Sequence, residues 1–300
     1  PDSSSTSMRG NPGMAEARTM VQPGLRPHGR PVHFVDGDQQ GDARAEDTLR
    51  EIALSLGFRE VSFQYEPVAA ALDYERGVAG EELALIADIG GGTSDFSVIR
   101  LGPDRHARED RAADILANEG VRVGGVDFDR RLSLGAVMPL LGYGSPMKRA
   151  ELEVPSTYFH ELATWSSINK LYDGRAVRQI REVRREAARP ELLDRLIRVI
   201  DDERGHGLAA EVETAKIRLS EQDEAILPLG WVESGLEAGI RRDAFERHTH
   251  ALAEKIRERI ARCLIAAGIA AVRIDAVFLT GGSTIFDTPF LFELLRKDAE

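Results

Sequence analysis

The sequence has almost no cysteine. Cys263 is the only one among 300 residues, which excludes a disulfide framework and a cysteine-based metal site. It lies in the helical pattern RIARCLIAAG, which predicts a small buried apolar residue rather than a nucleophile. Long apolar runs are also missing, since none approaches the roughly 18 residues of a membrane span. We therefore expect a soluble, cytoplasmic chain with no membrane partner.

The sequence also lacks an excess of positive charge. It has 39 basic and 50 acidic residues, for a net charge of −11. This balance repels a polyphosphate backbone, so we expect no nucleic-acid partner, whereas a nucleotide held by backbone amides is compatible with it. With 300 residues, 42% of them hydrophobic, the chain can bury a sizeable core and should form two lobes or subdomains.

Residues 1–30 are rich in Ser, Pro, Gly and Arg and have no apolar period, which predicts a flexible lead-in. The chain opens with Pro1 rather than Met, which indicates a piece of something longer. We expect ordered structure from Pro31, with a strand at Val32–Val35, a helix at Asp42–Gly57 and a strand at Val61–Tyr65. The apolar face of that helix is predicted to contain Leu49, Ile52, Ala53 and Leu56. Strand, helix and strand in this order predict a parallel α/β layer.

The most informative stretch is DIGGGTSD, which lies between two apolar runs and reads as strand, tight turn and strand. Its glycines lack the Cβ that would keep the backbone away from a ligand, so their N–H groups can converge on a phosphate. Its aspartates flank the turn, where carboxylates can orient a hydrated divalent cation or a water molecule. The plainer interpretation is a glycine-rich hairpin with solvated aspartates. The residues in question are Asp88, Gly90, Gly91, Gly92, Thr93 and Asp95.

Two further glycine turns follow predicted strands. Gly124 and Gly125 precede a predicted helix at Asp127–Leu141, and free N–H groups at such a helix start are a second candidate phosphate contact. A third turn, LTGGS, follows the apolar strand that begins at Ile274 and contains Gly281, Gly282 and Ser283. Strand, glycine turn and helix form a geometry in which nucleotides approach the backbone.

Two helices have polar residues that suit a ligand. Glu66 lies between a strand and a helix with proline in its first turn, either as a functional side chain or as a charge that complements the helix dipole. Glu213, Lys216 and Ser220 project from one helix face beside Ile217 and suit a ribose and a base. An ordinary Glu–Lys surface pair is the alternative.

The remaining segments indicate helices. Residues 146–207 have charged and apolar residues at spacings of three and four, which predicts an amphipathic helical lobe. Arg242–Gly268 is predicted as a long amphipathic helix with Phe245, Leu252, Ile256 and Ile260 in register. His248 and His250 within it face different directions, so a metal pair is not expected.

Five motifs in order resemble the actin, sugar-kinase and DnaK-type chaperone superfamily. DIGGGTSD resembles its second phosphate loop and LTGGST its adenosine loop. FQYEPVAAALDY, VGGVDFD and ETAKIRLS resemble the DnaK-type motifs N-E-P-T-A-A-A, L-G-G-E-D-F-D and E-x-A-K-x-x-L-S. YEPVAAALDYE together with MPLLGYGS resembles the YegD-like branch. The resemblance covers the chain from about residue 31 to its end.

The resemblance implies a partial actin-like (ribonuclease-H-like) α/β ATPase fold with a helical lobe inserted in its second half. It implies five segments: a flexible segment (1–30), a remnant of the first lobe (31–80), the second-lobe sheet with its phosphate loop (81–122), a mostly helical subdomain (123–241) and the return of the second lobe (242–300). The implied cofactors are ATP or ADP with Mg²⁺. The implied partners, besides nucleotide, are an unfolded polypeptide or a co-chaperone.

The resemblance also implies a role for each candidate residue. Gly90, Gly91, Gly92 and Thr93 hold the β- and γ-phosphates, with Gly124 and Gly125 nearby. Asp88 and Asp95 orient Mg²⁺-bound water and the attacking water, and Glu66 links the phosphate site to the lobe hinge. Glu213, Lys216 and Ser220 contact ribose and adenine, and Gly281, Gly282 and Ser283 line the adenine side.

Departures from the family pattern leave the activity open. Ile217 and Ile285 stand where DnaK-type proteins place the two arginines that sandwich adenine, so we expect altered base recognition. The family's first phosphate loop and catalytic lysine have no counterpart before Pro31, and we expect truncation at both ends. The first hypothesis is the ATPase module of a chaperone. The alternatives are a nucleotide-binding regulator without turnover, a small-molecule kinase and an actin-like filament subunit.

Overall fold

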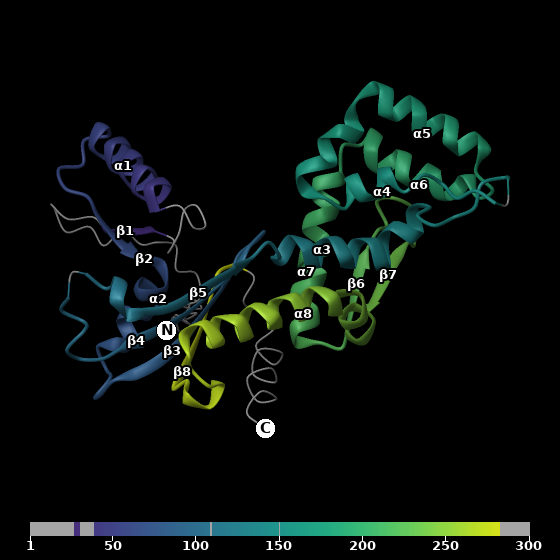
Figure 1. Cartoon of the computed structure of the whole chain (residues 1–300). Helices are drawn as coiled ribbons and strands as arrows, with labels where there is room; N and C mark the ends of the chain where they lie inside the picture. Colours follow the sequence, from purple (N-terminus) through teal and green to yellow (C-terminus); the bar gives the residue numbers. More distant parts are fainter. Residues whose placement is uncertain (1–26, 31–38, 109, 150, 283–300) are drawn as a thin grey trace, which may run out of the picture. The chain divides into compact units, whose positions relative to one another are not determined.

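The computed structural model describes residues 27–30, 39–108, 110–149 and 151–282 (Figure 1). These residues divide into two compact units, each built from separate stretches of the chain. The first unit comprises the described parts of Pro1–Ile86, Ser97–Asn118 and Ala266–Phe278. The second comprises those of Ala87–Phe96, Glu119–Ile265 and Leu279–Glu300.

Helices and strands alternate in the first part of the chain and helices dominate the second. The elements up to residue 141 are β1 (Pro27–Arg30), α1 (Gln39–Ser55), β2 (Ser62–Tyr65), α2 (Glu66–Glu75), β3 (Glu82–Ile89), β4 (Ser94–Leu101), η1 (Ala112–Asp114), β5 (Ile115–Val121), α3 (Gly125–Leu132), the π-helix η2 (Ser133–Val137) and η3 (Met138–Leu141). The later elements are α4 (Thr157–Leu162), η4 (Trp165–Tyr172), α5 (Gly174–Glu186), α6 (Pro190–Asp201), α7 (Gly205–Glu221), β6 (Glu224–Pro228), β7 (Glu237–Arg241), α8 (Arg242–Ala267), η5 (Ala271–Arg273) and β8 (Ala276–Thr280). None of the helices in the described ranges is both long and apolar enough to cross a membrane.

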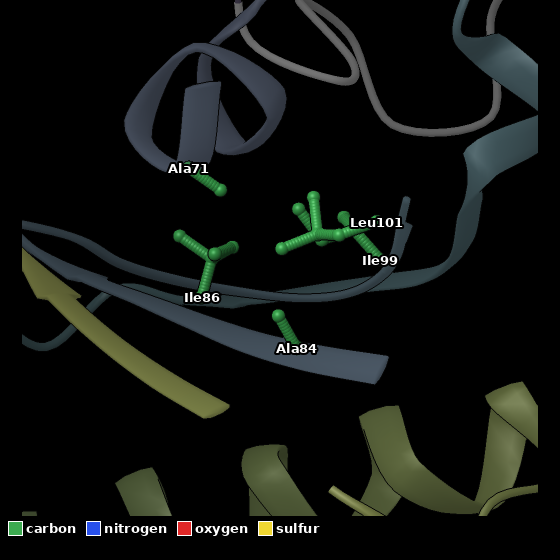
Figure 2. Packing of buried hydrophobic residues seen from close by; sticks show 5 residues of the cluster. All are labelled: Ala71, Ala84, Ile86, Ile99 and Leu101. Carbon is green, nitrogen blue, oxygen red and sulfur yellow. The ribbon is translucent and has the colours of Figure 1, made fainter. Parts of the chain in front are cut away.

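A four-stranded sheet has the order β5-β4-β3-β8, and the boundary between the two units falls within its strands. In the first unit, α2 covers one face of this sheet (Figure 2). Figure 2 shows the side chains of the strands directed toward α2, in a cluster formed by Ala71, Ala84, Ile86, Ile99 and Leu101. Full burial of each larger aliphatic side chain stabilises the fold by roughly 1.5–3 kcal/mol. At the edge of the sheet, Leu83 and Asp275 exchange two hydrogen bonds of 2.8 Å, which hold the approach to β8 against β3.

The parallel layer that we expected near the start of the chain is present, with a shifted first strand. β1 pairs with β2 in parallel, with Pro27 opposite Ser62. Residues 27–30 therefore form a strand, although the sequence predicted a flexible segment up to residue 30. The predicted strand Val32–Val35 lies outside the described residues.

Helix α1 has the predicted position, but its predicted apolar face is not a buried face. Ala53 is buried, whereas Ile52 and Leu56 are 51% and 74% exposed. The helix contacts its neighbours through Arg50 instead. The Arg50 guanidinium donates a hydrogen bond of 2.7 Å to the carbonyl of Val61 and lies over the ring of Phe63 at 4.9 Å. Of the predicted apolar face, only Ala53 is therefore buried among the described residues.

A buried ionic cluster joins the end of α2 to the segment before β5 in the first unit. The Arg111 guanidinium, 1% exposed, donates two hydrogen bonds to the Glu75 carboxylate at 2.8 and 2.9 Å and a third to Asp114. Asp114 also accepts from Arg105, and Glu75 accepts from the Gly102 amide at 3.0 Å. Buried charges are tolerated only with such complete pairing. The cluster therefore holds α2 on the end of β4.

The second unit contains helices over much of residues 146–207, where the sequence predicted amphipathic helices. Helices α4 to α6 pack around buried aliphatic side chains, and α5 and α6 are bridged by Arg181–Asp201 and Arg184–Asp194 pairs. An antiparallel hairpin of β6 and β7 follows α7. Helix α8 buries the four residues predicted to be in register, Phe245, Leu252, Ile256 and Ile260. Cys263 is fully buried in the same helix, as predicted, and its thiol donates to the Phe96 carbonyl at 3.3 Å.

Candidate functional site

The first glycine turn is a tight hairpin between β3 and β4. The amide of Gly90 donates to the carbonyl of Thr93 at 2.9 Å, which leaves Gly91 and Gly92 at the tip. Gly91, Gly92 and Thr93 are exposed, and none of the glycines in this turn has a positive φ. The amides of Gly91 and Gly92 have no acceptor among the described residues. Two backbone donors at the hairpin tip are therefore free for a ligand.

The second glycine turn lies against the first. A Cβ added at Gly124 would lie 2.5 Å from the carbonyl oxygen of Gly91 and 2.6 Å from the amide nitrogen of Gly92. The amide of Gly125 donates to the Gly90 carbonyl at 3.0 Å, and the amide of Val126 donates to the Gly91 carbonyl at 2.8 Å. Only glycine permits this close approach of two backbones. Two segments more than 30 residues apart are thereby joined at one point.

Those hydrogen bonds correct one of our expectations. We expected free N–H groups at the start of α3 as a second phosphate contact, and this expectation was wrong. The Gly124 amide donates to the Asp127 carboxylate at 3.0 Å as part of the helix cap, and the Gly125 amide is bonded to the hairpin. A nucleotide contact by these two glycines cannot use their N–H groups. The second turn supports the first one.

The third glycine turn reaches the end of β3. Gly281 has a φ of +89°, and a Cβ added there would lie 2.4 Å from the Ile89 carbonyl oxygen and 2.5 Å from Asp88 Oδ1. Gly282 is exposed, and a Cβ added there would meet no atom of the described residues within 4 Å, whereas Ser283 lies outside those residues. The three turns, which all belong to the second unit, thus meet at one end of β3.

The two predicted carboxylates differ in their surroundings. The Asp88 carboxylate is half-buried, and burial raises its pKa. It has no side-chain hydrogen bond or ion pair among the described residues. Asp95 is exposed on β4, and its Oδ1 lies 2.8 Å from the position that a Cβ on Gly120 would take.

These carboxylates fit a hydrated Mg²⁺ better than a directly ligated ion. The described residues contain no cluster of three or more His, Cys, Asp or Glu side chains that could hold a metal. Mg²⁺ keeps several of its waters and commonly uses only one or two carboxylates together with phosphate oxygens. The Asp88 carboxylate, which has no side-chain partner among the described residues, lies beside the glycine hairpin and matches that donor set.

Helix α7 packs against α3 and contains the other predicted side chains. Glu213 is exposed, and the Ser220 hydroxyl donates to the Ile217 carbonyl at 2.5 Å. Ile217 is 44% exposed. Lys216 is buried, with its Nζ 2.7 Å from Asp129 Oδ1 and 3.3 Å from the Gly125 carbonyl. Its ammonium is therefore held by the protein.

Glu66 belongs to a different unit from the glycine turns and α7. It is the exposed first residue of α2, directly after β2, and belongs to the first unit. Pro67 follows it in the first turn, as the sequence predicted.

Sequence reasoning missed Asp129 and Ser94. The Ser94 hydroxyl donates to the carbonyl of Val123 at 2.7 Å and so ties β4 to the second turn. Both residues lie within or beside motifs that we had singled out for their glycines. The sequence signal for Asp129 was the pair of aspartates two positions apart after Gly124 and Gly125. Asp127 accepts from the Gly124 amide as part of the helix cap, and Asp129 pairs with Lys216 of α7.

Comparison with known proteins gives consistent relatives. A family model described as Hsp70 protein matches residues 197–296. The chaperone protein DnaK of Thermosipho africanus is 24% identical over 278 residues, which is 89% of this chain and 36% of that protein. The chaperone protein DnaK of Thermotoga maritima is 26% identical over 263 residues, which is 85% of this chain and 33% of that protein. The chain spans about a third of the length of the curated relatives it matches.

Proposed function

We propose that the three glycine turns of this chain bind a magnesium nucleotide, ATP or ADP, and its matches to Hsp70 protein and to DnaK relatives support a DnaK-type, actin-like ATPase superfamily. The observation that carries this proposal is the meeting of the three turns at the end of β3, beside an unpartnered carboxylate. Backbone amides bind phosphate well because they donate without a side chain between them and the anion. The free amides of Gly91 and Gly92 support such binding at the hairpin tip.

Each residue of the hairpin has a defined role in this proposal. Gly91 and Gly92 donate to phosphate oxygens, Gly90 closes the turn, and the Thr93 hydroxyl contacts the terminal phosphate. Asp88 orients water of the hydrated Mg²⁺, and Asp95 orients the attacking water. Bound Mg²⁺ supplies positive charge that offsets the charge of the phosphates. The chain's own contribution is positioning.

The nucleoside lies on the α7 side in this proposal. Glu213 and Ser220 contact the ribose, and Gly281 and Gly282 approach the adenine, together with Ser283. The exposed Ile217 supplies an aliphatic surface for the base. An aliphatic surface lacks the cation–π attraction of an arginine, so we expect base recognition to be weaker than phosphate recognition.

In the intact protein, we propose that this module is the ATPase part of a chaperone of the YegD-like branch. ATP hydrolysis, an unfolded polypeptide or co-chaperone as partner, and a link through Glu66 to the first lobe all belong to that proposal. Ile217 also favours a second candidate, a regulator that binds nucleotide without turnover, because it stands where DnaK-type proteins place an arginine that stacks on adenine. A small-molecule kinase of the same superfamily is the third candidate.

Calorimetry tests binding and turnover separately. We expect Mg·ADP and Mg·ATP to bind the chain, and Asp95→Asn to retain Mg·ADP while losing any hydrolysis. Turnover stimulated by unfolded peptide supports the chaperone, and turnover stimulated by small sugars supports the kinase. Binding with no turnover under either condition supports the regulator. If neither nucleotide binds at millimolar concentration, the proposal is wrong.

A further inference from the structure

Lys216 is a charged side chain held inside the protein beside the proposed nucleotide site. Its side chain is 5% exposed, and its Nζ lies 2.7 Å from Asp129 Oδ1 and 3.3 Å from the Gly125 carbonyl oxygen. A buried ammonium is costly unless it is paired and hydrogen-bonded, so these contacts hold the side chain in one position. A lysine that extends to a ribose would have to leave both partners. The structure therefore points to a role different from the nucleotide contact that we had expected.

The partner of Lys216 depends on it in turn. Asp129 lies on α3, and burial raises the pKa of its carboxyl, which the Lys216 ammonium partly offsets and Glu213 reinforces. Loss of Lys216 would leave this partly buried carboxylate without its cation. Either α3 shifts to expose the carboxylate, or the carboxyl takes up a proton.

A short chain of contacts leads from Lys216 to the hairpin. Lys216 donates to the carbonyl of Gly125, and the amide of the same residue donates to the carbonyl of Gly90 at 3.0 Å. The next amide, that of Val126, donates to the Gly91 carbonyl at 2.8 Å. Gly125 is thus held from both sides, by α7 and by the hairpin. A shift of the first turn of α3 would move Gly90 and Gly91 with it.

We propose that Lys216 is a positioning residue, which holds the first turn of α3 against the glycine hairpin through Asp129 and Gly125 and does not contact the nucleotide. The inference rests on the proposed function, because the hairpin it positions is the proposed phosphate site. It assigns Lys216 to the phosphate end of the site rather than to the ribose. The affinity for phosphate alone should then depend on it.

Two ligands distinguish positioning from direct contact. Mg·pyrophosphate lacks a ribose, whereas Mg·ADP has one. If Lys216 positions the hairpin, Lys216→Met lowers the affinity for both ligands by about tenfold, and the two factors agree within about twofold. A tenfold change in affinity corresponds to about 1.4 kcal/mol. If Lys216 contacts the ribose, only Mg·ADP loses affinity, and the inference is overturned. Lys170→Met is the matched control, because Lys170 is exposed in η4 of the same unit, and it should change neither affinity.

The pair itself is tested with a double variant. Replacing both charges, in Lys216→Met/Asp129→Leu, removes the buried unpaired carboxylate. The double variant should therefore bind Mg·pyrophosphate more tightly than Lys216→Met, and Lys216→Arg should retain most of the affinity. If the double variant loses as much affinity for Mg·pyrophosphate as the two single variants together, Lys216 does not act through Asp129.

Hydrogen exchange gives a measurement that needs no ligand. The amides of Gly125 and Val126 should exchange at least tenfold faster in Lys216→Met than in the parent chain. Leu196→Ala in the helical lobe controls for a general loss of stability and should leave these two amides less affected than Lys216→Met does. Unchanged exchange at both amides overturns the inference. If the parent chain binds neither ligand, the proposed function fails, and the exchange data still decide whether Lys216 holds the turn.

Discussion

Replacing Gly281 with alanine places a methyl group against the backbone of β3. The new Cβ would lie 2.4 Å from the Ile89 carbonyl oxygen and 2.5 Å from Asp88 Oδ1, in a residue with a φ of +89°. The left-handed backbone costs an alanine about 1–2 kcal/mol, and overpacking adds about 1–3 kcal/mol. Reduced freedom of the unfolded chain returns about 0.4–1 kcal/mol. We therefore expect Gly281→Ala to lower the free energy of unfolding by about 2–4 kcal/mol.

Scanning calorimetry measures this loss, which corresponds to a Tm lower by roughly 5–12 °C. The neighbouring Gly282→Ala is the control, because a Cβ there meets no atom within 4 Å in the part of the chain that the structure describes, and its φ is not positive. Its Tm should stay within about 2 °C of the parent. Equal Tm values for the two variants would refute the close approach of the third turn to β3.

Three other substitutions test separate contacts. Asp88→Asn removes a half-buried carboxylate whose pKa in the folded state is raised by burial. The ionised group therefore destabilises the fold above that pKa, and this penalty disappears below the ordinary pKa of an aspartate, near 4. The variant should have a Tm roughly 1–2 °C higher at pH 7 but not at pH 3, and its binding of ADP should no longer depend on Mg²⁺. Gly124→Ala directs a Cβ into the Gly91 backbone and should lower the free energy of unfolding, measured in urea, by about 1–3 kcal/mol. Gly92→Ala is the control, because a Cβ there meets no atom of the described residues within 4 Å. A larger loss of stability in Gly92→Ala than in Gly124→Ala would contradict the packing of the two turns. Arg111→Met leaves buried carboxylates without their cation and should lower stability by about 3–5 kcal/mol, and an unchanged urea midpoint would exclude the buried cluster.

Periodicity and glycine placement predicted the long helix and the turns well. Helix α8 spans Arg242–Ala267 and ends before Gly268, which has a φ of +68°, as expected for a helix stopped by glycine. The glycines of the third turn were recognised because an apolar strand ran directly into them. Helix ends and glycine turns depend on residues that are close in the sequence, so they can be predicted from a short stretch of it.

Contacts with residues far away in the sequence could not be predicted in the same way. The pairing of Lys216 with Asp129 joins residues 87 positions apart, and helical spacing alone showed only that Lys216 lies on the same face as Glu213. A free amide at Gly125 was predicted because nothing local to Gly125 indicates that the Gly90 carbonyl is its acceptor. The contact of Arg50 with the Val61 carbonyl could likewise not be predicted from the apolar spacing of α1.

The most direct test of the proposed site is a titration of protein labelled with ¹⁵N-glycine, followed by NMR. With Mg·ADP, the amide resonances of Gly91, Gly92 and Gly282 should shift, while those of Gly230 and Gly239, which lie around the β6–β7 hairpin, should stay in place. Shifts confined to those two glycines, or no shift of the hairpin amides at millimolar nucleotide, would contradict a phosphate site built from the meeting glycine turns.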